Sequence, residues 1–312
     1  VFQPGVNEEL AATAAWGTQM IQLYDQPKID GVFSLWYGKG PGLDRAMDAI
    51  RHANMGGSSK LGGMLLAVAD DPIGKSSTLA YQSEQSLISA GIPIFYPANV
   101  HEVVPLGLQA YQLSRYAGIC VGLKITADTA DSSAVVDLKS LRPKFKNLLN
   151  IENVHIQKHE SALDREETLF TKRLPASKDF IFQHKINKII RNPKNKNLGI
   201  IAVGKACTET IDALESIGII DPEKNGVGIF SCKVPWPLSG EEIKNFINGY
   251  KEIFVIEEKR AVVEEQVAHI LYNHDQKPIL SGKFDGKTQE KLIPEIAELS
   301  SDITVSYTHL RA

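Results

Sequence analysis

Cysteine is scarce in this sequence, with only three among 312 residues: Cys120, Cys207 and Cys232. They lie far apart and no two have C-x-x-C spacing, so the sequence offers neither a zinc ribbon nor a cysteine-ligated iron–sulfur cluster. Dispersed cysteines are typical of proteins from a reducing compartment, and we expect a cytoplasmic protein.

An excess of either charge is also missing. Lysine and arginine number 34, aspartate and glutamate 37, and the formal net charge is -3. Without a basic excess or a polybasic run, the sequence does not favour a nucleic-acid partner or an anionic membrane. No apolar run approaches the ~20 residues that span a bilayer, and no signal-peptide pattern opens the chain. We therefore expect no nucleic acid and no membrane.

Short apolar runs and amphipathic stretches alternate in the first half of the chain. Expected strands cover 32–36, 64–69, 92–96 and 119–125, and expected helices cover 8–19, 43–50 and 103–116. Strands that alternate with helices favour a parallel sheet with helices on both faces. The first half therefore predicts an α/β domain.

A second alternation follows a segment rich in charge and asparagine, 140–196, which we interpret as a connector with one or two exposed helices. Expected strands cover 198–203, 227–230 and 253–256, and expected helices cover 206–217 and 262–272. This pattern indicates a second, smaller α/β domain. The predicted division is 1–139, 140–196, 197–280, the start of another segment at 281–305, and a non-native tail at 306–312.

Two glycine-rich turns follow apolar runs, at 38–42 and around Gly74-Lys75-Ser76. A phosphate loop, G-x-x-x-x-G-K-[ST], would need glycine where Ala69 stands. Asp70 and Asp71 would repel phosphates, and Pro72 removes an amide donor. These residues disfavour nucleotide binding, and a plain surface turn closed by Asp-Pro stays open as an alternative.

Glu8 begins an alanine-rich stretch, V-N-E-E-L-A-A-T-A-A-W-G. Acidic residues favour the first turn of a helix because of the helix dipole, and Glu9 fits that role. Asn7 is a candidate N-cap, and the alanines give the helix a smooth face that could dock closely on a partner. A functional role and a purely structural role for Glu8 both stay open on these grounds.

These residues resemble a known family. The pattern from Glu8 to Gly17 is similar to the helix that carries the cofactor-activating glutamate of thiamine diphosphate enzymes. K-x-x-G-L-D-x-A-x-D at 39–48 and the A-D-D-P segment resemble the indolepyruvate ferredoxin oxidoreductases, in particular their large fused bacterial form. The second half adds the further matches G-I-I-A-V-G, K-V-P-W-P-L, I-F-V-I-E-E-K and V-E-E-Q-V, which resemble a transketolase C-terminal-like domain.

The resemblance implies a parallel-sheet, pyrimidine-binding thiamine diphosphate domain, truncated at its N-terminus, followed by the smaller transketolase C-terminal-like α/β domain. It implies oxidative decarboxylation of a 2-oxoacid of the indolepyruvate or aryl-pyruvate type to an acyl-CoA, with electrons passed to ferredoxin. Glu8 would be the activating glutamate, nearly buried and facing a strand-end cleft or a subunit interface. Lys39, Gly42 and Asp44 would flank the pyrimidine, and position suggests Lys124 or Thr126 as substrate contacts.

The sequence also departs from this family. No G-D-G signature with a following asparagine is present, because Phe284 precedes Asp285-Gly286. We expect the metal site for the diphosphate, with Mg²⁺, and the iron–sulfur clusters to lie on missing domains or another subunit. The expected partners are those domains, ferredoxin, coenzyme A, the 2-oxoacid and a second copy in a homodimer. The alternative is a non-catalytic α/β binding or assembly module, in which Glu8 is solvated.

Overall fold

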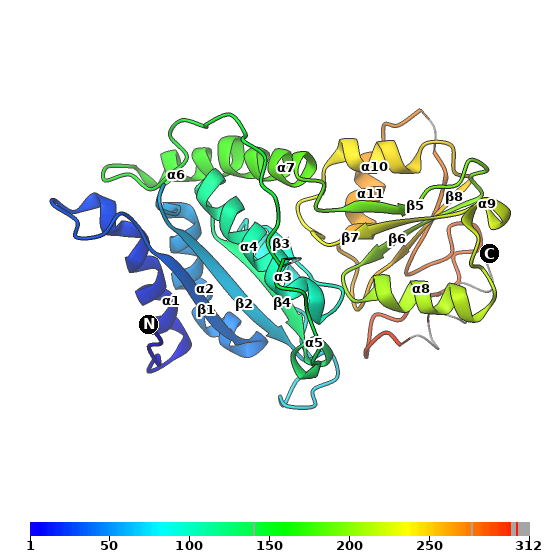
Figure 1. The fold of residues 1–312 in the computed structure, drawn as a ribbon, viewed down its shortest axis with the longest axis horizontal. Helices are drawn as coiled ribbons and strands as arrows, with labels where there is room; N and C mark the ends of the chain where they lie inside the picture. Colours follow the sequence, from blue (N-terminus) through cyan, green and yellow to red (C-terminus); the bar gives the residue numbers. More distant parts are fainter. Residues whose placement is uncertain (140, 276, 301–303, 305–312) are drawn as a thin grey trace. The chain divides into compact units, whose positions relative to one another are not determined.

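The computed structural model describes residues 1–139, 141–275, 277–300 and 304. The chain divides into two compact units, Val1–His184 and Lys185–Ala312, and each has its own sheet (Figure 1). The tail predicted to be non-native, 306–312, lies outside the described residues.

The first unit contains four parallel strands in the order β1-β2-β4-β3. They are β1 (Phe33–Lys39), β2 (Gly63–Asp70), β3 (Ile94–Phe95) and β4 (Val121–Thr126). Most of β2 is buried, as its continuous apolar sequence predicts for an inner parallel strand. Only Ser34 and Trp36 of β1 are buried, because β1 is an edge strand of the described sheet.

The helices of the first unit cover both faces of this sheet, as predicted. They are α1 (Glu8–Gly17), α2 (Gly40–Gly56), α3 (Glu84–Ser89), α4 (Val100–Ala117), α5 (Ala127–Asp131), α6 (Ala162–Thr168) and α7 (Leu174–Gln183), with a 3₁₀ turn at Thr18–Leu23 and a π turn at Leu169–Arg173. The connections through α2 and α3 lead across the sheet from β1 to β2 and then to β3, and the connection through α4 leads back from β3 to β4. Right-handed crossovers therefore place α4 on the face opposite α2.

Part of the segment expected to be a connector with exposed helices packs into the first unit. Residues 162–183 form α6, the π turn and α7 there; α6 is mostly exposed, whereas Leu169, Phe180 and Ile181 are buried. Arg173 is fully buried and donates to the carbonyls of residues 54–56 at the end of α2 and to Val154 O. The sequence did not predict this buried side, because charged residues cover the outer side of the segment.

The second unit contains five strands in the order β5-β7-β6-β8-β9. They are β5 (Lys188–Arg191), β6 (Leu198–Val203), β7 (Val227–Cys232), β8 (Glu252–Ile256) and β9 (Ile279–Ser281). All pair in parallel except β5, an antiparallel edge strand that falls within the expected connector. Its four residues, K-I-I-R, are exposed or half-exposed, so they lack the buried apolar pattern that marked the other strands.

Among the described residues, four helices accompany the second sheet: α8 (Ala206–Ser216), α9 (Pro222–Asn225), α10 (Gly240–Ile247) and α11 (Val263–Leu271). The chain moves across the sheet in one direction through α8 and in the other through α10 and α11. Right-handed crossovers put α8 on the face opposite α10 and α11, which Figure 1 shows within this unit. The two sheets confirm the predicted α/β class.

Replacing Arg173 should strongly destabilise the first unit. The variant Arg173→Met leaves buried carbonyls at the end of α2 without their donor, and we expect a loss of about 2–5 kcal/mol of unfolding free energy. Urea unfolding followed by the fluorescence of Trp16 and Trp36 measures it. The neighbouring exposed Lys172→Met is the matched control and should change little. Equal stability of the two variants would contradict this role.

Glu242 should make the second unit less stable as pH rises. Glu242 accepts a bond from Asn187 Nδ2 (3.3 Å), and burial raises the pKa of its carboxyl to about 7. Because the folded state holds this proton more tightly than the unfolded chain, stability falls as pH rises from about 4.5 to about 7. Glu242→Gln should remove this component, roughly 1–3 kcal/mol at pH 8 and near zero at pH 4.

Urea unfolding at the two pH values, in a Trp16→Phe/Trp36→Phe background that leaves Trp236 as the one fluorescent tryptophan, checks this expectation. Glu241→Gln, on the exposed neighbour of Glu242, is the matched control and should follow the unmodified chain at both pH values. A Glu242→Gln variant that parallels this control would show that Glu242 does not set the pH dependence.

Candidate functional site

The sequence-predicted site residues gather at the carboxyl end of β1 in the first unit. Lys39 ends β1, Gly40 begins α2, and Gly42 and Asp44 lie in the first turns of that helix. Pro41 suits this position because a helix start needs no amide donor there. In a parallel sheet, ligands usually bind beyond the carboxyl ends of the strands, so this edge is where a site is expected.

Glu8 reaches the same edge from α1. Asn7 caps α1 through its side chain, which accepts from Leu10 N (2.8 Å), and Trp36 Nε1 donates to Glu8 O (3.0 Å). These bonds fix the first turn of α1 beside β1. A methyl group on Gly42 would lie 2.8 Å from Glu8 Cγ, so the close approach of Glu8 to α2 requires glycine at this position.

The Glu8 carboxylate remains accessible in the described chain. Its side chain is 42% exposed and its Oε2 lies 3.7 Å from Arg45 Nε. The expectation that Glu8 is nearly buried was therefore wrong, although the side chain does lie at a strand end. It contacts Gly42 and Arg45 of α2, and its position beside the start of that helix suits a negative charge.

No described hydrogen bond or ion pair joins Lys39 or Asp44 to Glu8. Both side chains instead form hydrogen bonds that hold the loop at 71–82. Lys39 Nζ donates to Ser76 O, and Asp44 Oδ1 accepts from Tyr81 OH (2.5 Å) and Ser86 Oγ (3.3 Å). A methyl group on Gly40 would overlap the Tyr81 ring, so that ring packs directly on the β1–α2 turn. Burial, and then the bond to Asp44, raise the pKa of Tyr81 well above its ordinary value.

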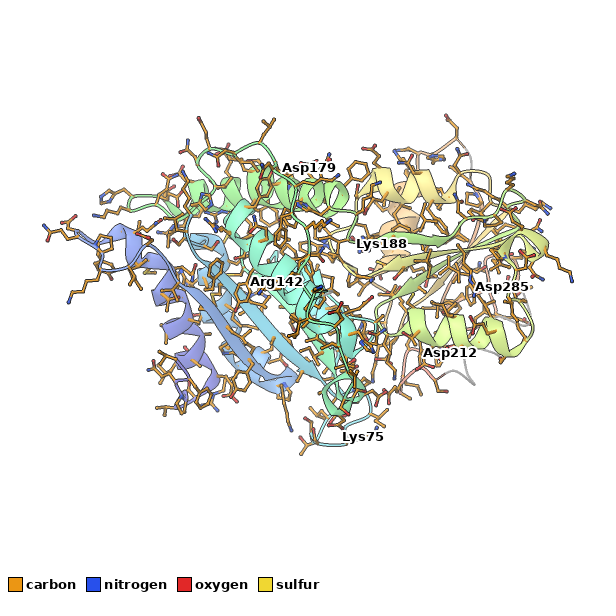
Figure 2. The ribbon with its side chains drawn as sticks, viewed as in Figure 1. Lys75, Arg142, Asp179, Lys188, Asp212 and Asp285 are labelled. Atoms are coloured by element: carbon orange, nitrogen blue, oxygen red, sulfur yellow. The ribbon has the colours of Figure 1, made fainter. Side chains whose placement is uncertain are left out.

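The loop itself argues against a phosphate site. Asp71 accepts from Lys75 N (2.9 Å) and Ser76 N (2.6 Å), and these bonds, that of Ser76 foremost, lower the pKa of Asp71. A phosphate loop would offer those amides to its ligand, but here a carboxylate of the loop already takes them. This geometry fits the alternative of a surface turn at Gly74-Lys75-Ser76, which the sequence left open. Figure 2 labels Lys75 on this loop.

Beneath the loop lies a buried charged cluster. Lys124 Nζ is 2.6 Å from Glu84 Oε1 and 3.2 Å from Asp70 Oδ2, and the three side chains are 1%, 6% and 0% exposed. Thr126, on the same strand, is also buried. The suggestion that Lys124 or Thr126 contacts substrate was therefore wrong, because neither side chain is accessible in this structure.

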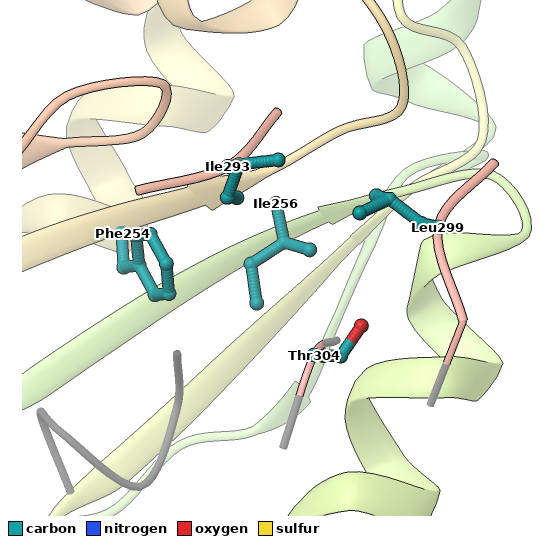
Figure 3. Close-up of a pocket in the computed structure, with 5 residues that line it drawn as sticks. All are labelled: Phe254, Ile256, Ile293, Leu299 and Thr304. Carbon is teal, nitrogen blue, oxygen red and sulfur yellow. The ribbon is translucent and has the colours of Figure 1, made fainter. Parts of the chain in front are cut away.

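The second unit was not predicted to carry a site, and two of its features are relevant to ligand binding. A shallow apolar depression beside β8, too small to hold a water molecule, is lined by Phe254, Ile256, Ile293, Leu299 and Thr304, none of which is ionisable (Figure 3). Glu257 is buried and its carboxylate caps α11 by accepting from the amides of residues 262–264. A carboxylate thus occupies this helix start, which leaves no free anion site there.

The cysteines lack the features of reactive thiols, and the residues that the structure describes form no metal site. All three cysteines are buried, and burial raises the pKa values of Cys120 (to about 12) and Cys232. Thiols in such surroundings are unreactive. Among the described residues, no group of three or more His, Cys, Asp or Glu side chains could hold a metal ion. The part of the chain covered by the structure also contains no helix with the length and apolar character of a membrane span.

Sequence reasoning missed Arg45, Tyr81 and the role of Lys124. Arg45 had a signal, since it stands beside Asp44 in the helix start that was singled out. Tyr81 had none, because it lies 37 residues from its partner Asp44. Lys124 occupies a strand sequence, V-G-L-K-I-T, whose charged residue suggested an exposed end rather than a buried pair.

Several known proteins are similar to this chain. Residues 187–311 match the model of the indolepyruvate ferredoxin oxidoreductase middle domain. The indolepyruvate oxidoreductase subunit IorA of Methanothermobacter thermautotrophicus is 24% identical over 311 residues, covering 97% of this chain and 46% of that protein. IorA of Pyrococcus horikoshii is 25% identical, covering 83% and 39%. The chain thus spans about half the length of the curated relatives that it matches.

Solved structures agree on the fold. A 2-oxoglutarate:ferredoxin oxidoreductase from Magnetococcus marinus superposes with a TM-score of 0.63 at 14% identity, over 98% of this chain and 56% of that chain. A split-gene transketolase, described as an inactive β4 tetramer, gives a TM-score of 0.57 at 11% identity, over 99% and 83%. These likenesses show the fold of the chain. The family model and the relatives show that the chain is similar to the indolepyruvate ferredoxin oxidoreductases, with the match to the family model confined to residues 187–311.

Proposed function

We propose that this chain supplies the pyrimidine-binding part of a thiamine diphosphate enzyme that oxidatively decarboxylates a 2-oxoacid. The family match supports an oxidoreductase of this class. The same proposal assigns an aryl-pyruvate such as indolepyruvate as the substrate, an acyl-CoA as the product and ferredoxin as the electron acceptor, in a cytoplasmic enzyme. The substrate and the electron acceptor rest on the names of the family model and the relatives. The acyl-CoA product rests on the coenzyme A compounds bound in the Magnetococcus marinus structure, and the compartment rests on the dispersed cysteines.

The observation that carries the proposal is the accessible Glu8 carboxylate at the carboxyl end of β1. Its backbone is fixed by Trp36, its side chain passes over Gly42, and nearly half of it stays exposed. A carboxyl that must meet a heteroaromatic ring nitrogen needs a rigid support and an open side. Glu8 has both, so the residues present fit the pyrimidine half of the cofactor.

In the proposed site the chain's own residues have separate roles. Glu8 would hold a proton between its carboxyl oxygen and the ring nitrogen of the pyrimidine. Gly42 leaves room for Glu8, while Lys39 and Asp44 fix the loop at 71–82 beside the turn. Thiamine diphosphate, when bound, would supply the electron sink for decarboxylation.

Other parts of the enzyme would complete the site. The described residues hold no cluster for a metal ion, so Mg²⁺ and the diphosphate would bind to a further domain or subunit. The iron–sulfur clusters would lie there too, since the three cysteines are buried and dispersed. A homodimer would allow one copy to complete the site of another. The proposed partners are therefore the remaining domains, a second copy, ferredoxin and coenzyme A.

A non-catalytic assembly module is the alternative, and one observation favours it. The exposed Glu8 carboxylate lies near Arg45, as in an ordinary surface ion pair. In that case Glu8 and its turn would contribute only to the fold, and substitution of Glu8 would leave turnover of the assembled enzyme unchanged.

Glu8→Gln in the assembled enzyme that contains this chain separates the two functions. Gln keeps the shape of the side chain but cannot exchange the proton, so we expect turnover to fall about 10²–10⁴-fold. Thiamine diphosphate affinity should change only a few-fold, because most of the cofactor would bind elsewhere. Steady-state assays and a cofactor titration measure both. Glu9→Gln, on the exposed neighbour, is the control, and unimpaired turnover of Glu8→Gln would refute the assignment.

Gly42→Ala tests the close approach of Glu8. The new methyl would lie 2.8 Å from Glu8 Cγ and must displace that side chain, so we expect at least about a tenfold loss of turnover. Gly17→Ala is the matched control, since nothing lies within 4 Å of its added methyl. That variant should keep turnover and gain up to about 1 kcal/mol of stability. Full activity in both variants would show that the Glu8 position does not matter.

A further inference from the structure

The segment 71–82 joins β2 to α3 without helix or strand, yet its two ends are held together. Ser83 donates to Asp70 Oδ2 through both its amide and its hydroxyl, at 3.0 Å each. Tyr81 N also donates to Asp71 O (3.1 Å). A loop of this length with closed ends is an Ω-loop, and we name Asp70, Ser83 and Glu84 its neck.

Lys124 lies under the neck and joins its two sides. Asp70 ends β2 and Glu84 begins α3, and both carboxylates contact the same ammonium group of β4. The Nζ atom also lies 4.6 Å from the centre of the Tyr96 ring. All three charges are almost completely buried, so solvent does not screen the repulsion between the carboxylates. The lysine is what allows the two sides of the neck to stay close.

The closed neck in turn fixes the loop against the proposed cofactor turn. Tyr81 lies two residues before the neck, and its ring packs on Gly40 while its hydroxyl bonds to Asp44. On the other side of the loop, Ser76 O accepts from Lys39. Each contact couples a residue of the loop to a residue of the β1–α2 turn, which also carries Gly42 beneath Glu8.

We propose that Lys124 is a positioning residue, which clamps the neck of the 71–82 loop and thereby fixes the β1–α2 turn of the cofactor site. It acts through Asp70 and Glu84 and does not itself touch a ligand. The effect on the loop depends on the geometry alone, whereas its consequence for the cofactor rests on the proposed function.

The clamp is tested by hydrogen exchange on this chain, with the double variant Lys124→Met/Glu84→Met. This change removes one positive and one negative charge, so the net charge of the cluster is unchanged. Asp70 loses its ion pair with Lys124 but keeps its bonds to Ser83. We expect amide exchange across 71–83 to rise about tenfold or more, with exchange in α2 and α4 unchanged. Unchanged exchange of the loop in the folded variant would overturn the proposal.

A matched control removes a different ion pair of the same loop. Lys75→Ala/Asp128→Ala deletes the exposed pair at 3.8 Å, and it should leave exchange at the neck unaltered. If exchange at the neck rises equally in this control, the clamp is not specific. Should the first double variant fail to fold, Glu84→Gln keeps the side-chain shape and should raise loop exchange in the same direction. Lys124→Arg, which preserves the charge, should keep the loop amides as protected from exchange as in the unmodified chain.

The cofactor consequence is measured in the assembled enzyme. The neck variant should raise the thiamine diphosphate concentration for half-maximal activity about tenfold, with a smaller effect on turnover at saturation. Glu8→Gln should do the reverse. Faster loop exchange with no change in cofactor requirement would confine Lys124 to the fold and overturn the positioning role. Normal turnover of Glu8→Gln would instead refute the proposed function and leave the loop result standing.

Discussion

Every feature of the candidate site depends on the parallel pairing of the first sheet. Parallel strands bring their carboxyl ends to one edge, so residues distant in sequence meet there. Lys39 at the end of β1, Asp70 at the end of β2 and Lys124 near the end of β4 share this edge. The Ω-loop and the start of α2 follow from the same pairing, since both continue from these strand ends. An antiparallel arrangement would divide these residues between two edges.

Charged side chains in this protein are paired with polar groups of the backbone as well as with opposite charges. The guanidinium of Arg173 meets carbonyls at the end of α2, and the carboxylates of Asp71 and Glu257 meet amides at turns. Each charge faces the helix end or turn whose dipole opposes it. In consequence the amides of the 71–82 loop and of the start of α11 are already satisfied, whereas the carboxylate of Glu8 stays accessible.

The sequence predicted the regular parts of the fold well. The strands at 64–69 and 198–203 consist of apolar residues, so burial alone locates them, and the alternation with helices implied parallel sheets. Strand β5 escaped because its exposed K-I-I-R sequence has no such signal. The buried side of 162–183 was not predicted for a related reason. Most charged residues of this segment lie on its outer face, and the sequence does not distinguish Arg173 from them although Arg173 is fully buried.

The site was predicted less completely, because local motifs identify residues but not their partners. Glu8 and Gly42 were singled out on pattern, and the structure places them in contact. Lys39 and Asp44 were singled out too, yet their bonds run to Ser76 and Tyr81, which no local pattern connects to them. The exposure of Glu8 was not predicted for the same reason, because a residue's surroundings depend on elements outside its own segment.

The exposure of Glu8 and the burial of Lys124 fit the different roles proposed for these two residues in the first unit. A carboxyl that is to meet a ligand or another domain must keep an open side, and 42% of the Glu8 side chain is exposed. A charge that fixes a loop is most effective when water is excluded, and Lys124 is 1% exposed. The chain covers 46% of the length of IorA from Methanothermobacter thermautotrophicus. An open carboxylate on a rigidly held turn is the form expected of a surface that another part of such a protein would cover.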